Sequence, residues 1–331
     1  MAPFVVNMLR SQLLTSIPYP TSDFSGQTVI VTGSNTGLGR EAAKHIVRLN
    51  AAKVILAVRT ISKGTAAAAD IIASCNVSAE RVEVWELDMS SHQSIKDFAK
   101  RSANLDRLDA AVLNAGVMSY AWSEQDGVEQ HMGVNVVGTV LLLRLLYPVL
   151  QRSAEHTGSR GRMTVVGSGL MNTANLSDFK TPGSILNKFN EQGNIPIGNY
   201  YRDSKLLTFY ATRHLAELSP VAETNVIVTV QTPGVCESDI FRDDAGLLES
   251  VAMKASMAML ARSAEVGGRT LVHAVNPDLP VDAHGRFLVD CQISDGAPGI
   301  DNEEGLAIAK QWNKEICELV DGIIGGRATW T

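Results

Sequence analysis

The stretch Thr32-Gly33-Ser34-Asn35-Thr36-Gly37-Leu38-Gly39 follows an apolar, β-branched run over residues 28–31 and precedes a helical pattern over residues 40–49. Glycine lets the backbone turn tightly and approach a ligand closely, and the first N–H groups of a helix attract an anion. A strand, a glycine-rich turn and a helix in this order predict a site for the pyrophosphate of a dinucleotide. The alternative is an ordinary strand-to-helix turn that happens to contain glycines.

A second stretch, Tyr201-Arg202-Asp203-Ser204-Lys205, opens another helical pattern. Residues four apart share one face of a helix, so we expect the phenol of Tyr201 and the ammonium of Lys205 to lie together, whereas Tyr200 points elsewhere. A phenol ordinarily titrates at about pH 10, and a neighbouring cation in a dry site lowers its pKa. The pair therefore predicts a tyrosine that exchanges protons near neutral pH. The alternative is a pair of surface neighbours.

Short apolar runs alternate with helical patterns along the chain, and this alternation predicts βαβ units. The runs are continuously apolar, as a parallel sheet covered on both faces requires. We therefore expect an α/β fold with a single doubly wound, Rossmann-type domain over residues 26–325, helices on both faces of a parallel sheet, and an N-terminal extension, 1–25. The predicted strands are 28–31, 54–58, 82–87, 108–113, 163–166, 225–230 and 286–289. The predicted helices are 40–49, 63–73, 91–103, 124–150, 201–218 and 303–320.

The bulk composition limits the classes of function. The chain has 331 residues, of which 45% are hydrophobic and 19% are charged, which is enough to bury a large core. A formal net charge of −6, without a basic cluster, argues against a nucleic-acid-binding protein. The four cysteines are widely separated in the sequence. They predict thiols in the reducing cytoplasm rather than disulfides or a metal site.

Two apolar segments raise the question of a membrane. Residues 1–16 are interrupted by polar side chains and are too short for a span, so we expect an amphipathic helix that packs on the domain. A weak association of this helix with a membrane surface is the alternative. Residues 134–150 contain Asn135 and Arg144 and predict a buried helix. The oligomeric state stays open, although the long helix, 124–150, offers a surface on which two copies could pair.

The glycine spacing is similar to the Thr-Gly-x3-Gly-x-Gly fingerprint of the short-chain dehydrogenase/reductase superfamily. Residues 56–59, Leu-Ala-Val-Arg, and the long spacer before Tyr201 resemble the retinol-dehydrogenase-like branch, which includes many fungal enzymes. This resemblance implies an oxidoreductase that uses a nicotinamide cofactor. It extends in the expected order from about residue 27 to residue 289, at Asp88, Asn114-Ala115-Gly116, Asn135, Ser168, Tyr201 with Lys205, and Pro233-Gly234.

The end of the second predicted strand bears on the choice of dinucleotide. An enzyme that prefers NAD usually places a carboxylate there, but this chain has Arg59, whose guanidinium suits a 2′-phosphate. We therefore expect NADP(H) as the cofactor, and we expect the positive charge of Arg40 to add to the attraction for the phosphate. The alternative is that Arg59 is a surface arginine without a ligand. The resemblance implies that Asp88 contacts the adenine, caps the next helix, or does both, and that Asn114 lines the ribose. The other predicted cofactor contacts are residues 33–39, Ala115, Gly116, Tyr201, Lys205, Pro233, Gly234 and Ser238.

The resemblance also implies roles in catalysis. Tyr201 exchanges the proton on the substrate oxygen, and Ser168 stabilises the charge that develops there. Lys205 binds the nicotinamide ribose and, together with the positive nicotinamide of the oxidised cofactor, lowers the phenol pKa. The backbone carbonyl of Asn135 holds a water molecule that continues the proton relay; a structural kink in the long helix is the alternative. The implied reaction interconverts a ketone or aldehyde and an alcohol, with reduction as the expected direction.

A fairly large, apolar substrate is expected, because two predicted lid segments are rich in apolar side chains. The first segment, 170–199, contains Leu170, Met171, Leu176, Phe179, Ile185, Leu186 and Phe189. The second, 235–260, contains Ile240, Phe241, Leu247, Leu248, Val251 and Met253. A polyketide or terpenoid intermediate, a retinoid and a steroid-like molecule all fit this description.

Three other functions share parts of this pattern. A non-catalytic NADP(H)-binding sensor or scaffold has the same fold, but such proteins commonly lack the Tyr/Lys pair. Nucleotide-sugar epimerases and dehydratases share that pair, yet they have a different glycine spacing and a larger C-terminal domain. An enoyl reductase acts on a C=C bond. Cofactor oxidation with a panel of ketones distinguishes an enzyme from a sensor, and the product distinguishes carbonyl from alkene reduction.

Overall fold

An eight-stranded sheet forms the centre of the molecule, in the order β10-β9-β8-β7-β4-β1-β2-β3. Neighbouring strands pair in parallel, except that β10 pairs antiparallel with β9 at one edge. The computed structural model describes residues 2–125, 127–180, 183–237, 240, 260–294 and 300–326. The strands of the sheet are β1 (Thr28–Thr32), β2 (Lys53–Val58), β3 (Val82–Glu86), β4 (Ala110–Leu113), β7 (Gly161–Val166), β8 (Val226–Thr232), β9 (Phe287–Val289) and β10 (Gln292–Ile293).

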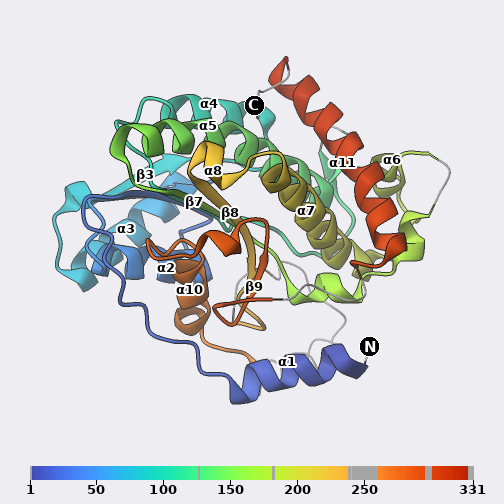
Figure 1. Ribbon diagram of the computed structural model, residues 1–331, viewed down its shortest axis with the longest axis horizontal. Coiled ribbons are helices and arrows are strands. Elements are labelled where there is room, and N and C mark those ends of the chain that lie inside the picture. Colours follow the sequence, from blue (N-terminus) through green and yellow to red (C-terminus); the bar gives the residue numbers. More distant parts are fainter. Residues whose placement is uncertain are drawn as a thin grey trace.

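Helices cover both faces of this sheet, as Figure 1 shows. One face packs against α2 (Gly37–Arg48), α3 (Ile61–Cys75) and α10 (Ala264–His273). The opposite face packs against α4 (His92–Ser102), α5 (Thr139–Thr157), α7 (Tyr200–Glu217) and α11 (Glu303–Ile324). This arrangement is the doubly wound α/β fold that the sequence predicts. The remaining elements are α1 (Ala2–Leu14), η1 (Ala79–Arg81), β5 (Glu124–Gln125), β6 (Val128–Glu129), η2 (His131–Gly138), η3 (Gly169–Thr173), η4 (Leu176–Phe179), α6 (Ile185–Asn190), η5 (Ile197–Asn199), α8 (Val221–Thr224) and η6 (Val281–Ala283).

The central strands are apolar along their whole length because both of their faces are buried. Every residue of β1, β7 and β8 is buried. In β1, Ile30 packs in the core on the α5 side, whereas Val29 and Val31 pack in the core on the α2 side. Burying a side chain of this size stabilises the fold by about 1.5–3 kcal/mol.

The start of the long helix differs from the prediction. Instead of a helix, Glu124–Gln125 and Val128–Glu129 form the two short antiparallel strands β5 and β6. The buried carboxylate of Glu129 accepts hydrogen bonds from the backbone N–H groups of His131 (2.8 Å) and Met132 (3.0 Å), and the π-helical segment η2 begins there. The helix then continues as α5 to Thr157, so the loop expected after residue 150 is mostly helical.

The segment His131–Thr157 is long and apolar enough to cross a membrane by length and composition alone. However, 78% of its most apolar window is buried inside the protein. Within it, Arg144 is 5% exposed and pairs with Asp321 of α11 at 2.9 Å. The helix therefore serves as a core helix, as the sequence predicts.

The helix α1 packs on the domain, in agreement with the favoured interpretation of residues 1–16. It lies outside the two helical layers, near β9 (Figure 1). Polar side chains connect it to the domain; for example, Gln12 donates a hydrogen bond of 2.7 Å to the carbonyl of Val235. Its outward face carries exposed apolar side chains, and the weak association with a membrane surface stays a prediction. These side chains are Val5, Val6, Leu13 and Leu14.

Candidate active site

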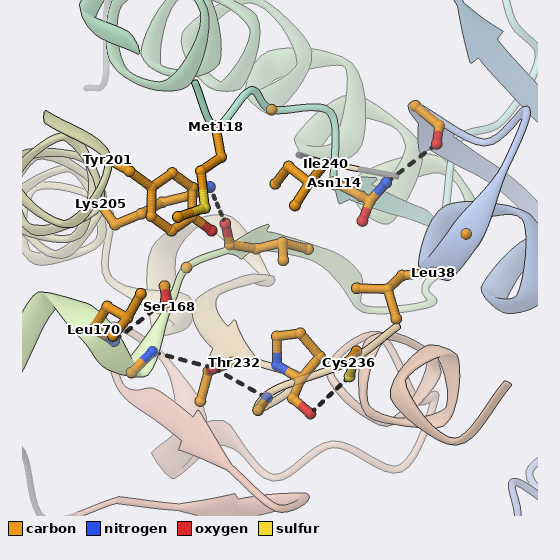
Figure 2. Close-up of a pocket in the computed structure, with 18 of the residues that line it drawn as sticks. Leu38, Asn114, Met118, Ser168, Leu170, Tyr201, Lys205, Thr232, Cys236 and Ile240 are labelled. Carbon is orange, nitrogen blue, oxygen red and sulfur yellow. Dashed lines mark hydrogen bonds between the residues drawn. The ribbon is translucent and has the colours of Figure 1, made fainter. Parts of the chain in front are cut away.

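A cavity of about 880 Å³ opens at the carboxyl ends of β1, β4, β7 and β8. Doubly wound sheets bind their ligands at this edge, and the volume is in the upper range of small-molecule sites. Figure 2 shows Tyr201, Lys205 and Ser168 on one side of this cavity, with Leu38 and Asn114 on the other. The two stretches singled out in the sequence therefore meet in a single site.

The glycine turn between β1 and α2 forms one end of the cavity. Gly33 and Gly37 have positive φ angles of 63° and 56°, which side chains other than glycine rarely adopt. A Cβ on Gly33 would press against the backbone of Ala115, whereas Gly37 faces open space. The N-terminus of α2 is thus accessible to an anion, and this cradle fits the pyrophosphate of a dinucleotide.

Two residues of the turn are structural. Ser34 is fully buried, and its hydroxyl donates a hydrogen bond of 2.8 Å to the carbonyl of Val31. Gly39 lets α2 approach β4, because a Cβ there would overlap Asn114. Neither residue is among those that line the cavity, and the cofactor contacts predicted for them stay predictions. The lining residues of the turn are Gly33, Asn35, Thr36, Gly37 and Leu38.

Asn114 joins β4 to the glycine turn. Its Nδ2 donates a hydrogen bond of 2.9 Å to the carbonyl of Thr32. In return, Oγ1 of Thr32 accepts hydrogen bonds from the backbone N–H groups of Asn114 and Ala115, both at 2.9 Å. Asn114, Ala115 and Gly116 line the cavity as predicted. Asn114 therefore shapes the site in addition to facing it.

Asp88 lines the cavity just after β3. Its Oδ1 accepts hydrogen bonds from the backbone N–H (3.0 Å) and the hydroxyl (2.7 Å) of Ser90. The cap of α4 is Ser91, whose hydroxyl accepts a hydrogen bond from the N–H of Ser94. Asp88 thus stabilises the turn before the helix rather than the helix end itself, and its contact with adenine stays a prediction.

Arg59 lies at the rim of the cavity, directly after β2, and its side chain is exposed. Within the described part of the chain, Arg59 forms neither an ion pair nor a hydrogen bond. Arg40, in contrast, pairs with Glu41 at 3.1 Å and with Asp70 at 3.9 Å, and it does not line the cavity. The structure therefore leaves Arg59 available for a phosphate and does not support the contribution predicted for Arg40.

Tyr201 and Lys205 share one face of α7, one helical turn apart, and both line the cavity. The ammonium of Lys205 lies 5.7 Å from the centre of the Tyr201 ring. Ser168, which follows β7, also lines the cavity, and its hydroxyl lies near enough to the phenol of Tyr201 to oppose the rise of the phenol pKa. Tyr200 points into the core, where its hydroxyl donates a hydrogen bond of 3.3 Å to the carbonyl of Phe189. The choice of Tyr201 over its neighbour agrees with this geometry.

Burial dominates the electrostatics of the pair in the chain itself. Burial raises the pKa of Tyr201 to about 12, although the hydroxyl of Ser168 opposes this shift. Burial also lowers the pKa of Lys205 to about 8. Loss of solvation therefore dominates the phenol pKa in the chain itself. The predicted lowering requires the positive nicotinamide of the oxidised cofactor as well as Lys205, and it stays a prediction. Tyr201 keeps its proton at neutral pH.

Asn135 lies in the π-helical segment, where the backbone departs from regular α-helix, and the structural role considered as an alternative stays open. Its side chain exchanges two hydrogen bonds with the backbone of Val117, at 2.8 Å and 2.9 Å, and donates one of 3.1 Å to Ser204. Its backbone carbonyl accepts a hydrogen bond of 2.9 Å from the hydroxyl of Thr208. Asn135 thus fixes α7 beneath Lys205, and the water-mediated relay stays a prediction.

Comparisons with known proteins agree with this geometry. Residues 27–181 match the family model described as short chain dehydrogenase. The short chain dehydrogenase/reductase dmxR8 of a Cryptosporiopsis species is 36% identical over 326 residues, which cover 97% of this chain and 98% of that protein. This chain belongs to the short-chain dehydrogenase/reductase family.

Other relatives of this short-chain dehydrogenase/reductase are also fungal. The short-chain dehydrogenase anuD of Penicillium roqueforti is 36% identical, over 96% of this chain and 83% of its own.

A crystal structure from Mycobacterium paratuberculosis shares the fold, with a TM-score of 0.66, 23% identity and coverage of 93% of this chain and 97% of its own. A short chain dehydrogenase from Shigella flexneri, complexed with NADP, has a TM-score of 0.58, 20% identity and coverage of 81% and 98%. Membership of the retinol-dehydrogenase-like branch stays a prediction.

The substrate end of this short-chain dehydrogenase/reductase departs most from the sequence analysis. Of the seven apolar residues expected in the lid 170–199, only Leu170 lines the cavity; the others pack in the core or against it. In the second lid, Ile240 lines the cavity, as do Pro233 and Gly234 before it. The remaining predicted residues lie outside the described part of the chain: Ser238, Phe241, Leu247, Leu248, Val251 and Met253.

Sequence reasoning missed the contribution of α1 to the site. The side of this helix that faces the domain lines the cavity, although it is more than two hundred residues away in sequence from the loop it contacts. No local pattern reports such a contact, because it depends on the path of the whole chain. The lining residues from α1 are Phe4, Asn7, Met8, Ser11 and Gln12.

Proposed function

We propose that this protein uses NADP(H) to interconvert a ketone or aldehyde and an alcohol on a fairly large apolar substrate, with Tyr201 as general acid and base. The observation that carries the proposal is the convergence of Tyr201, Ser168 and Lys205 at one side of a cavity that also contains the glycine cradle. All four cysteines are free thiols, which suits a reaction in the reducing cytoplasm.

The bound dinucleotide would supply or accept the hydride at its nicotinamide ring. The substrate oxygen would bind next to the hydroxyls of Ser168 and Tyr201, which line the same side of the cavity. Ser168 donates a hydrogen bond to this oxygen, and Tyr201 transfers its proton to it as negative charge develops. Lys205 donates a hydrogen bond of 2.8 Å to the carbonyl of Val166, which holds its charge next to the phenolate that remains.

The preference for NADP(H) rests on Arg59. Arg59, which has no partner among the described residues, offers a planar set of donors to a 2′-phosphate, and no carboxylate directly follows β2 to accept from ribose hydroxyls. The preference for an apolar substrate rests on the lining next to Ser168. There Met118, Leu170 and Phe4 present apolar side chains.

The test is to mix the purified protein with NADPH and a panel of ketones and aldehydes of increasing apolar size. We expect loss of the absorbance of reduced nicotinamide with the larger members, and an alcohol as product by mass spectrometry and NMR. Binding of NADPH without oxidation by any member would favour the non-catalytic sensor. A saturated ketone formed from an unsaturated one would favour the enoyl reductase.

A further inference from the structure

The helix α1 faces the cavity with both polar and apolar side chains, while other apolar side chains of this helix face solvent. Ser11 and Gln12 line the cavity, whereas Val6 and Leu13 are 63% and 59% exposed. Because apolar side chains lie on both sides of α1, apolar burial alone does not fix its orientation. Specific hydrogen bonds from its inner side contribute to how α1 lies on the molecule.

Arg262 is the centre of these hydrogen bonds. Its side chain is 6% exposed, and it donates to the carbonyl of Ser11 (2.7 Å) and to the carbonyl of Pro233 (3.1 Å). It also pairs with Asp290 at 2.8 Å, and Asp290 accepts a further hydrogen bond of 2.8 Å from the hydroxyl of Ser11. A single buried guanidinium thus links α1, the loop after β8 and the turn after β9.

Gln12 makes a second link to the same loop. Its Nε2 donates hydrogen bonds to the carbonyl of Val235 (2.7 Å) and to the carbonyl of Leu260 (3.0 Å). Gly234, with φ of 78°, lies so close that a Cβ there would overlap the side chain of Gln12. The backbone of this loop, which lines the cavity at residues 233–235, therefore takes its position partly from α1.

The apolar side chains on the inner side of α1 lie near the catalytic serine. Phe4 and Met8 both line the cavity. A Cβ on Gly169 would be 3.8 Å from Cε2 of Phe4, so the ring lies over the residue that follows Ser168. The cavity wall next to the reacting groups thus includes a helix outside the region matched by the family model, which begins at residue 27.

We infer that α1 is the wall of the substrate pocket that determines specificity. Phe4 and Met8 select a substrate large and apolar enough to reach them, and Arg262 and Gln12 are positioning residues that hold the loop at 233–235. This inference rests on the proposed function, since it names the residues that recognise the apolar part of the ketone. The experiments that test this inference measure binding constants, so they can disprove it whether or not the protein reduces a ketone.

The first experiment compares Phe4→Ala and Met8→Ala with Leu13→Ala, a control that removes a similar apolar side chain from the outward face. The dissociation constants of a bicyclic or larger apolar ketone and of acetone are measured on the NADPH complex through nicotinamide fluorescence. We expect the large ketone to bind about 10- to 100-fold more weakly to the two inner variants. The dissociation constant of acetone should be unchanged in all variants, and Leu13→Ala should bind the large ketone as tightly as the wild type does. Equal weakening for both ketones, or the same loss in Leu13→Ala, would overturn the inference.

The second experiment tests the positioning residues without a substrate. Gln12→Leu removes the two donated hydrogen bonds, and Arg10→Leu is the matched control on the exposed side of the helix. We expect the NADPH dissociation constant to rise about 5- to 10-fold in Gln12→Leu, while the thermal midpoint of this variant stays unchanged. The NADPH dissociation constant of Arg10→Leu should equal that of the wild type. An NADPH affinity of Gln12→Leu equal to that of the wild type would contradict the role of α1. If the wild type fails to oxidise NADPH with every ketone of the panel, the proposed function fails. The two binding experiments still test this inference, because they measure dissociation constants and not turnover.

Discussion

The ammonium of Lys205 lies 5.7 Å from the centre of the Tyr201 ring, and it donates a hydrogen bond to the carbonyl of Val166 instead of to the phenol. The lysine therefore acts on the tyrosine as a nearby charge. Because burial leaves the pKa of Tyr201 at about 12, the phenol is protonated at neutral pH, which is the form that carbonyl reduction consumes. The charge of Lys205 then lowers the cost of leaving a phenolate behind.

Replacing Tyr201 with phenylalanine should abolish most of the turnover while leaving NADPH binding nearly unchanged. The phenol donates the proton in the proposed reaction, and a positioned acid contributes about 10²–10⁴-fold in rate. Steady-state kinetics and a fluorescence titration with NADPH measure the two quantities. Tyr200→Phe is the matched control, because its hydroxyl donates only to the carbonyl of Phe189 in the core. Retained turnover in Tyr201→Phe would remove this residue from the mechanism.

The rate of ketone reduction should fall as the pH rises through about 8. Burial lowers the pKa of Lys205 to about 8, so its charge is present below this value and is lost above it. Alcohol oxidation requires the phenolate of Tyr201, and its rate should rise with pH instead. Turnover in both directions, measured between about pH 6 and pH 10 with circular dichroism as a check on folding, tests the signs. A flat profile for reduction would mean that the charge of Lys205 is dispensable.

Replacing Arg59 with serine should change the choice of dinucleotide. A hydrogen bond to a charged group contributes about 1.5–3 kcal/mol, so the affinity for NADPH should fall about 10- to 100-fold and that for NADH should change little. Arg40→Gln is the control, because Arg40 already pairs with Glu41 and Asp70. The dissociation constants of NADPH and NADH, measured for the wild type and both variants, test this prediction. If the wild type binds NADH as well as NADPH, the assignment of NADP(H) is wrong.

The parts of the fold and site that the sequence predicts are those encoded by neighbouring residues. Strands such as β1 and β8 appear as continuous β-branched runs, and the pairing of Tyr201 with Lys205 follows from helix geometry. The strands β5 and β6 were missed because a tertiary contact helps to set the start of the helix. The backbone N–H of Glu129 donates to the side chain of Asn190, sixty-one residues away.

The sequence could give neither the wall formed by α1 nor the sign of the shift at Tyr201. Gln12 and Val235 are 223 residues apart in the sequence, so the hydrogen bond between them depends on the path of the whole chain. The pKa of Tyr201 depends on how completely packing removes water from the phenol, and a sequence pattern records the neighbouring Lys205 but not the burial. Burial also explains why most of the apolar residues at 170–199 belong to the core.

Replacing Asp203 with asparagine should stabilise the protein above neutral pH. Asp203 is fully buried in α7; its Oδ1 accepts a hydrogen bond of 3.2 Å from Arg202, and its Oδ2 has no partner among the described residues. Burial raises its pKa from 3.8 to about 7, so the folded state holds this proton more tightly than the unfolded state does. Between these two values the wild type loses stability as the pH rises, and above about 7 it bears the full cost of the buried charge.

Asp203→Asn lacks this charge, so it should unfold about 2–5 °C higher than the wild type at about pH 8, and the difference should shrink as the pH falls toward about 5. Thermal unfolding at several pH values measures both effects. Asp97→Asn, an exposed carboxylate on α4, should leave the midpoint nearly unchanged. A variant that is less stable than the wild type at every pH would show instead that the ion pair with Arg202 outweighs the cost of burying the carboxylate.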